Sequence, residues 1–330
     1  MIEYMQSAVA KWGEARVQEI LNLLHNSPCT VADDQHEMRA FGLHLISDER
    51  RALPNTEHGK NMPYLWDEQP LTWMLLAPFV LEAVVACEAA YDFIDIGVGT
   101  APFACWAASL PEIRRVLGID ANPRALRFAE ANVERNGLTM ELRQQWVEPG
   151  VLPNGCAKAI GIWPPYTPYP SHLERFIPLH ARGGCDTQDT WRSQIKTAFP
   201  ALAESGALIF NQCAPGGPAW HGCQAIAEIA DLAPGASVVW TEVYEPISAA
   251  EFIRALYDGN EPTFQEWWTQ TYTTHHYILG AIINDGQERR ERFTSPVVVN
   301  PDGWYTGRIP CFQDVMAVTW DRKRKEESGE

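Results

Sequence analysis

The sequence lacks any cysteine pattern typical of a metal site or a disulfide framework. Its eight cysteines are scattered, with no C-x-x-C pair and no metal-type spacing of Cys and His. This distribution gives no motif for zinc or iron, and we expect no bound metal. We interpret the cysteines as reduced, mostly buried thiols, which indicates a cytoplasmic protein.

Basic residues are scarce. The chain has 26 Lys and Arg against 42 Asp and Glu, a formal net charge of −16. Affinity for the phosphate backbone of a nucleic acid rests on Lys and Arg, so we expect no nucleic-acid partner. This charge is compatible with a protein partner or with a small cationic or neutral substrate.

Long apolar runs are missing as well. No stretch approaches the roughly 20 apolar residues that a membrane helix needs. The first 20 residues mix charges into their apolar positions and lack the apolar core of a signal peptide. We therefore expect no membrane association.

The residues that are present, 46% of them hydrophobic, suffice for a large core. We divide the chain into a helical N-terminal region (1–75), a central domain (76–285) and a C-terminal extension (286–330). Hydrophobic spacing and turn residues predict the outlying elements. These are helices over about 1–28, 33–45 and 70–89, and strands in the extension near 296–307 and 314–320.

The central domain alternates between strands and helices from residue 91. Seven strands are predicted, the first at DFIDIG. The second is followed by a helix with Asn122 as its N-cap, Pro123 as its first residue and Gly137 at its end. Strands separated by helices predict an α/β fold with a doubly wound, mostly parallel, seven-stranded sheet. We expect the sixth strand to be parallel and the seventh antiparallel.

A glycine turn follows the first strand directly. Gly97 and Gly99 allow the backbone to bend sharply and to approach a ligand at the start of the next helix. About 20 residues later, Asp120 ends the second strand, where its carboxylate can accept both hydroxyls of a ribose. A nucleoside cofactor is therefore predicted, either NAD or S-adenosylmethionine. The pattern GxGxA shows little sign of extra phosphate-binding groups, which favours S-adenosylmethionine.

These motifs resemble those of the class I S-adenosylmethionine-dependent methyltransferases, a Rossmann-like family. DIGVGTAPFA matches the cofactor loop, and GIDANPRALRFAEANVERNGL matches the ribose-binding strand and its helix. WPPY stands at the Asn-Pro-Pro-Tyr motif of the release-factor glutamine N-methyltransferases, the branch that the chain resembles most. The resemblance covers about residues 85–213.

The resemblance implies a set of cofactor-binding residues. Asp95, Gly97 and Gly99 would line the methionine portion, Asp120 the ribose, and Gln145 with Trp146 the adenine; Ala121 and Trp163 complete the set. Two positions depart from the family: Ala101 replaces the third glycine, and Gln145 replaces a carboxylate that would meet the adenine amine.

The family's acceptor site uses its Asn and the first Pro carbonyl to orient the target nitrogen, with the Tyr ring beside it. This sequence keeps Pro164, Pro165 and Tyr166, but Trp163 replaces the Asn. An indole donates a hydrogen bond and cannot accept one. A ring-bearing or small cationic acceptor therefore fits Trp163, Tyr166 and Tyr169 better than a glutamine side chain does. The alternative is that Trp163 only packs in the core.

A base for the acceptor's proton is predicted at the same edge of the sheet. His275 starts the antiparallel strand there, and Glu245 follows the sixth strand. The long segment between them (about 246–272) is predicted to be a lid that carries Trp267 and Trp268. The alternatives are that His275 and its neighbour His276 face solvent at the strand start and that the two Trp residues pack within the lid.

Three functions are compatible with these features. The first is an S-adenosylmethionine-dependent methyltransferase that acts on a small molecule, most readily on nitrogen, although the sequence does not separate N-, O- and C-methylation. The second applies the same chemistry to a protein side chain of the glutamine type. The third is a catalytically silent cofactor-binding or scaffold module, because fold alone does not fix function. The oligomeric state is left open.

Overall fold

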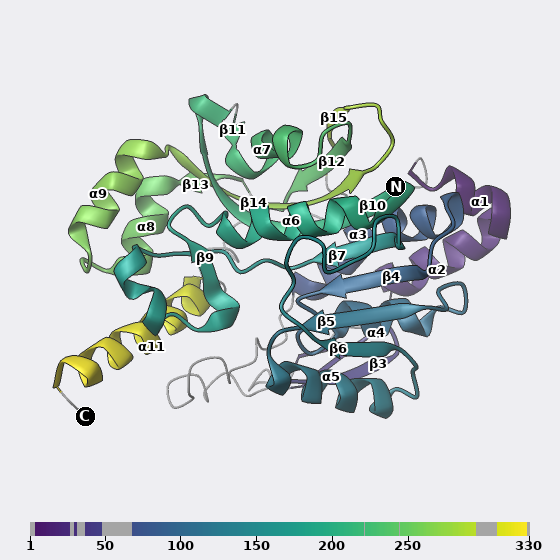
Figure 1. The fold of residues 1–330 in the computed structure, drawn as a ribbon, viewed down its shortest axis with the longest axis horizontal. Helices are drawn as coiled ribbons and strands as arrows, with labels where there is room; N and C mark the ends of the chain where they lie inside the picture. The colour runs from purple at the N-terminus through teal and green to yellow at the C-terminus, as the bar shows by residue number, and fades with distance from the viewer. Residues whose placement is uncertain are drawn as a thin grey trace.

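The computed structural model places a single large β-sheet at the centre of the protein, flanked by helices (Figure 1). Of the 330 residues, the structure describes 4–26, 30–31, 37–47, 68–220, 222–243, 245–294 and 309–328.

The seven predicted strands are all present in this sheet. Its order is β15-β12-β14-β10-β7-β4-β5-β6, and the short β11 and β13 pair with β10 and β14. β14 runs antiparallel to both β10 and β12, and the neighbouring pairs from β10 to β6 are parallel. The doubly wound, mostly parallel fold is therefore confirmed, and β15 adds an edge strand beside β12. The bounds are β4 (Tyr91–Ile96), β5 (Val116–Asp120), β6 (Glu141–Gln144), β7 (Ala157–Ile162), β10 (Leu202–Gly217), β11 (Gly222–Cys223), β12 (Ser237–Glu242), β13 (Ile247–Ser248), β14 (Thr274–Ile283) and β15 (Arg290–Arg292).

Two hydrophobic cores lie on the two faces of the sheet. Successive side chains of a strand point to opposite faces, so Phe93 of β4 joins one core and Ile94 the other. All six residues of β7 are buried, as expected for a central parallel strand covered on both faces. One face carries α3 (Glu68–Ala86), α4 (Pro102–Ser109) and α5 (Pro123–Arg135), and the other carries α6 (Asp189–Ala201) and α7 (Gln224–Leu232).

The N-terminal region differs in part from the prediction. The first predicted helix is two helices, α1 (Gln6–Trp12) and α2 (Glu14–Asn26), separated at Gly13. The helix predicted over 33–45 is wrong, because a small antiparallel sheet forms there. Its strands are β1 (Thr30–Val31), β2 (Glu37–Ala40) and β3 (Leu43–Ile46). The buried residues recur at every second position within each strand (Met38, Ala40, Leu43 and Leu45), and that is strand periodicity.

The C-terminal extension also differs. The strand predicted near 314–320 is wrong, because this segment lies within the helix α11 (Ile309–Ser328). Met316 and Thr319 are buried one helical turn apart, and Lys325 pairs with Asp321 at i,i+4 spacing. The strand predicted near 296–307 lies outside the described residues.

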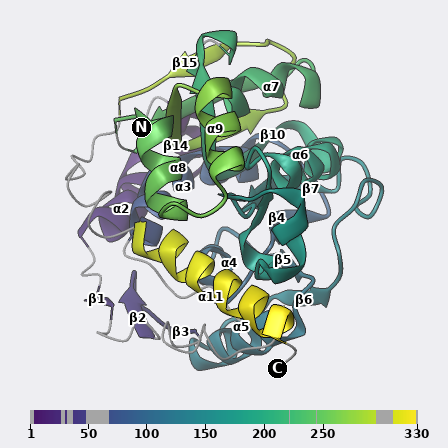
Figure 2. The same ribbon diagram turned by 90° about the vertical axis from the view of Figure 1, so that its left-hand side faces the viewer.

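Helix α11 packs against the segment predicted as a lid. This segment contains α8 (Ala249–Tyr257) and α9 (Pro262–Thr271). Figure 2 shows α11 in yellow, crossing below α8 and α9. The ring centroids of Trp320 and Tyr257 lie 6.2 Å apart, and the Lys323 Nζ lies 3.4 Å from the Glu261 Oε1. Among the described residues, the structure contains no helix with both the length and the apolar character required to cross a membrane.

Candidate cofactor and acceptor site

A cavity of about 620 Å³ opens at the carboxyl ends of β4, β5 and β7. In a doubly wound sheet this edge is where ligands bind, and the volume lies within the usual range of small-molecule sites. Most of the predicted site residues line it: Gly97, Gly99, Asp120, Ala121, Gln145, Trp146, Trp163, Pro164, Pro165, Tyr166 and Tyr169. The predicted cofactor and acceptor sets therefore share one cavity.

The glycine loop has the backbone conformation that its sequence requires. Gly97 and Gly99 have φ of 74° and 57°, in the left-handed region that glycine enters without steric cost. Ala101, the N-cap residue of α4, also has a positive φ of 62°. The Gly99 N–H donates to the Asp120 Oδ2 over 2.9 Å. This bond joins the loop after β4 to the end of β5.

Asp120 is held by main-chain donors on both oxygens. Its Oδ1 accepts from the Asn122 N–H over 2.8 Å, while Asn122 caps α5 through the Arg124 N–H. Burial raises the pKa of Asp120, and the backbone hydrogen bonds oppose that shift. A carboxylate has about four acceptor positions, so Asp120 retains capacity for a ligand hydroxyl beside its backbone hydrogen bonds from Gly99, Ala121 and Asn122.

Gln145 and Trp146 form the wall beside Asp120. The Gln145 N–H donates to the Asp120 main-chain carbonyl over 3.0 Å, which fixes the chain next to the carboxylate. The Trp146 side chain is 56% exposed although it lines the cavity. A large exposed ring at a cavity is suited to stacking on a flat heterocycle.

Asp95 lies behind the cavity wall. It is fully buried and does not line the cavity, and its Oδ1 accepts a hydrogen bond from the Trp163 indole N–H. Burial raises the pKa of Asp95 to about 7, although hydrogen bonds from Trp163 and the Ala104 backbone oppose the shift and nearby Asp120 adds to it. The structure thus places Asp95 as the partner of Trp163, where the sequence predicted contact with the cofactor.

Trp163 fills space that a glycine leaves free. Its indole lies against Gly161, where an added Cβ would stand only 3.0 Å from the ring. The centroids of the Trp163 and Phe103 rings are 5.3 Å apart. The residue is half-buried and lines the cavity. Trp163 therefore packs against the core with one part and lines the cavity with another.

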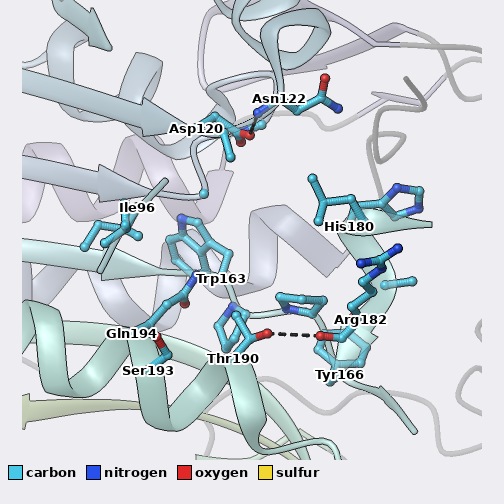
Figure 3. Close-up of a pocket in the computed structure, with 18 of the residues that line it drawn as sticks. Ile96, Asp120, Asn122, Trp163, Tyr166, His180, Arg182, Thr190, Ser193 and Gln194 are labelled. Atoms are coloured by element: carbon cyan, nitrogen blue, oxygen red, sulfur yellow. Dashed lines mark hydrogen bonds between the residues drawn. The ribbon is translucent and has the colours of Figure 1, made fainter. Parts of the chain in front are cut away.

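The acceptor side of the cavity is built from the chain after Trp163. Pro164 is buried, and Tyr169 is 6% exposed. β8 (Thr167–Pro168) pairs with β9 (Arg182–Gly184), where any side chain at Gly183 would collide with the Tyr166 backbone. In Figure 3, the Thr190 hydroxyl donates to the Arg182 main-chain carbonyl, which ties α6 to this wall.

Neither predicted base lines the cavity. His275 is 1% exposed, its ring stacks on Phe252 with centroids 3.6 Å apart, and burial holds its pKa well below the usual range. Glu245 is exposed in the loop after β12. The alternative that the two histidines face solvent is wrong, because His276 is also buried, between Glu242 and Thr274.

The two lid tryptophans do not line the cavity either. Trp268 is fully buried within the packing of α8 and α9, and Trp267 is 40% exposed on α9. Helix α8 reaches the acceptor wall through another residue: the Tyr257 hydroxyl donates to the Pro168 carbonyl over 2.8 Å. No sequence motif pointed to Tyr257, because its partner lies 89 positions away.

Several cavity residues were not predicted at all. They come from helices, strands and short turns of several segments: Thr72, Trp73, Phe103, Glu174, His180, Arg182, Gln194 and Asn211. Among the described residues, no group of three or more His, Cys, Asp or Glu side chains is arranged to hold a metal.

Comparison with known proteins finds similarity over part of the chain. No model of a protein family matches the sequence. The chain is 33% identical over 135 residues to the release factor glutamine methyltransferase of Gloeobacter violaceus, a match that covers 38% of this chain and 46% of that protein. The chain thus spans less than half the length of this curated relative.

Solved structures give more distant likenesses. The YcgJ protein of Bacillus subtilis is 14% identical with a TM-score of 0.38, covering 64% of this chain and 97% of its own. The phosphoethanolamine N-methyltransferase 2 of Haemonchus contortus, solved with S-adenosyl-L-methionine, is 13% identical with a TM-score of 0.34. This match covers 62% of the present chain and 51% of the Haemonchus chain. At these values the likenesses add nothing to what the sheet order shows.

Proposed function

We propose that this protein is an S-adenosylmethionine-dependent methyltransferase that methylates a nitrogen of a small molecule. One observation carries the proposal: a nucleoside-type site and a rigid aromatic wall line the same cavity. Asp120 and Trp146 line it together with Pro164, Tyr166 and Tyr169.

The residues present fit the cofactor. The left-handed Gly97 and Gly99 bring main chain to the cavity without side chains, and Asp120 keeps acceptor capacity for ribose hydroxyls. Trp146 offers a face for adenine, and Gln145 an amide for its exocyclic amine. When bound, S-adenosylmethionine supplies an activated methyl group to a nucleophile.

The acceptor wall favours an amine. Trp163 carries no acceptor atom, and its one donor is engaged by Asp95. Aromatic faces and the nearby carboxylates of Glu174 and Asp189 suit a cationic or polar nitrogen compound. The neutral form of the amine presents its lone pair to the methyl group, and an acceptor that arrives as a cation first releases its proton to solvent. Transfer then gives S-adenosylhomocysteine and a methylated ammonium ion, so the reaction needs no base from His275 or Glu245. Orientation by the walls is then the main catalytic contribution of the protein.

A second function is favoured by the relative from Gloeobacter violaceus, which is named as a release factor glutamine methyltransferase. In this alternative the acceptor is the glutamine side chain of a protein. The Trp at position 163 weighs against it, because the amide N–H groups of glutamine would find no side-chain acceptor there.

Transfer of a labelled methyl group tests both functions. Purified protein is incubated with methyl-labelled cofactor and, separately, with a panel of small amines and with a release factor. Label in an amine supports the first function and label in the release factor the second. Trp163→Asn is the diagnostic variant: it should lower transfer to an amine and raise transfer to a glutamine. Absence of label from every acceptor, together with absence of cofactor binding, would refute both.

A further inference from the structure

Gln194 lines the cavity and carries a buried hydrogen-bond acceptor that has no partner. The residue lies on α6, is 9% exposed and lines the cavity, and its Oε1 has no hydrogen-bond partner in the structure. A buried polar oxygen without a partner is unfavourable, and native proteins rarely keep one without a reason. A bound ligand that brings a donor to this oxygen would remove the penalty.

The position of Gln194 indicates which part of a ligand it meets. A Cβ built on Gly97 would lie 3.8 Å from the Gln194 Nε2 and 3.7 Å from the Trp163 carbonyl oxygen, so the carboxamide adjoins the glycine loop. Figure 3 shows Gln194 beside Trp163, on the opposite side of that ring from Asp120 and Asn122. Gln194 is therefore at the end of the cofactor site away from the ribose carboxylate.

Resting on the proposed function, we propose that the Gln194 Oε1 accepts a hydrogen bond from the α-ammonium group in the methionine portion of S-adenosylmethionine. A donor suits this position, because the unpartnered Gln194 Oε1 and the Trp163 carbonyl oxygen, which would lie 3.7 Å from a Cβ built on Gly97, are both acceptors. An ammonium offers three donors and no acceptor, whereas a carboxylate offers none. Hydrogen bonds from a charged donor are also the stronger kind.

The experiment measures affinity for three ligands by calorimetry. S-adenosylhomocysteine carries the α-amino group, its deamino analogue lacks only that group, and methylthioadenosine lacks the whole amino-acid portion. For the unaltered protein, removal of the amino group should weaken binding by about 10- to 100-fold, the size of one charge-assisted hydrogen bond. For Gln194→Leu, S-adenosylhomocysteine and the deamino analogue should bind almost equally, and methylthioadenosine should bind as it does to the unaltered protein.

Two further variants keep the test decisive. Gln224→Leu removes another buried amide whose Oε1 is unpartnered, but away from the cavity, and should preserve the full amino-group dependence. Gln194→Glu keeps an acceptor oxygen and should also preserve that dependence, which covers the case that Gln194→Leu does not fold.

The outcomes separate this inference from the proposed function. Equal amino-group dependence in the unaltered protein and in Gln194→Leu would overturn the contact while leaving cofactor binding intact. A matched loss of affinity for methylthioadenosine in Gln194→Leu would also overturn it, and so would loss of the dependence in Gln194→Glu. If none of the three ligands bound the unaltered protein, the proposed function itself would fail.

Discussion

Replacement of Asp95 by Asn should change how the stability of the protein depends on pH. Asp95 is fully buried, its pKa is raised to about 7 mainly by burial, and its Oδ1 accepts the Trp163 indole N–H. Asn has nearly the same shape, keeps an oxygen for that bond and never ionises. The variant therefore resembles the protonated state of Asp95.

The sign follows from comparing the folded and unfolded states. In the unfolded chain Asp95 ionises near pH 3.9, whereas in the folded protein it resists ionisation until about pH 7. Its contribution to stability is thus fully present below pH 4 and is lost as the pH rises through 7. At about 1.4 kcal/mol per pH unit, the loss approaches about 4 kcal/mol in all, with about 2–3 kcal/mol of it between pH 5 and pH 8.

Urea denaturation of both proteins at pH 5 and pH 8 measures this effect. The quantity of interest is the difference in unfolding free energy between Asp95→Asn and the unaltered protein, because other titrating groups cancel in it. The unfolding free energy of Asp95→Asn minus that of the unaltered protein should be about 2–3 kcal/mol more favourable at pH 8 than at pH 5.

Asp92→Asn is the control for Asp95→Asn. Burial of Asp92 is outweighed by its hydrogen bonds from Lys158 and the backbone, so its pKa is lowered and its contribution is constant over this range. A relative gain for Asp95→Asn of less than about 1 kcal/mol would refute the account of Asp95.

Two predictions concern polar contacts that position the site. Asn132 is fully buried, and its side chain makes three hydrogen bonds, two with the Ile46 backbone and one with the Thr100 carbonyl. Asn132→Ala should lower the unfolding free energy, measured by urea denaturation, by about 3 kcal/mol. A loss below about 1 kcal/mol would contradict this. Tyr257→Phe removes the buried bond to Pro168 and should cost about 1 kcal/mol. Tyr91→Phe loses an exposed hydrogen bond to Glu141 and should lower the unfolding free energy by less. Equal losses in the two variants would contradict the claim that the buried bond to Pro168 stabilises the protein more than an exposed one.

Most residues predicted for the cofactor half line one cavity, because the determinants of their positions are local. The glycine turn after β4 and the Asp at the end of β5 lie within short motifs whose geometry follows from strand direction. Asn122, Pro123 and Gly137 likewise mark the limits of α5 by local rules. Each of these residues acts on neighbours a few positions away.

The remainder depends on contacts between distant segments. The Asp95–Trp163 pair requires both the empty space at Gly161 and the burial of a carboxylate, neither of which a motif encodes. His275 was placed at the correct strand start, but whether its side chain faces the cavity or Phe252 depends on how α8 packs. The helix predicted over 33–45 failed because the hairpin at Phe41 and Gly42 interrupts the apolar pattern.

Calorimetric titration with S-adenosylhomocysteine tests the central claim most directly, namely that Asp120 anchors a nucleoside cofactor at this edge of the sheet. The unaltered protein should bind one equivalent, and Asp120→Asn, which removes the charge but keeps the shape, should bind about 10- to 100-fold more weakly. Binding of equal strength in the two proteins, or no binding to the unaltered one, would contradict the account.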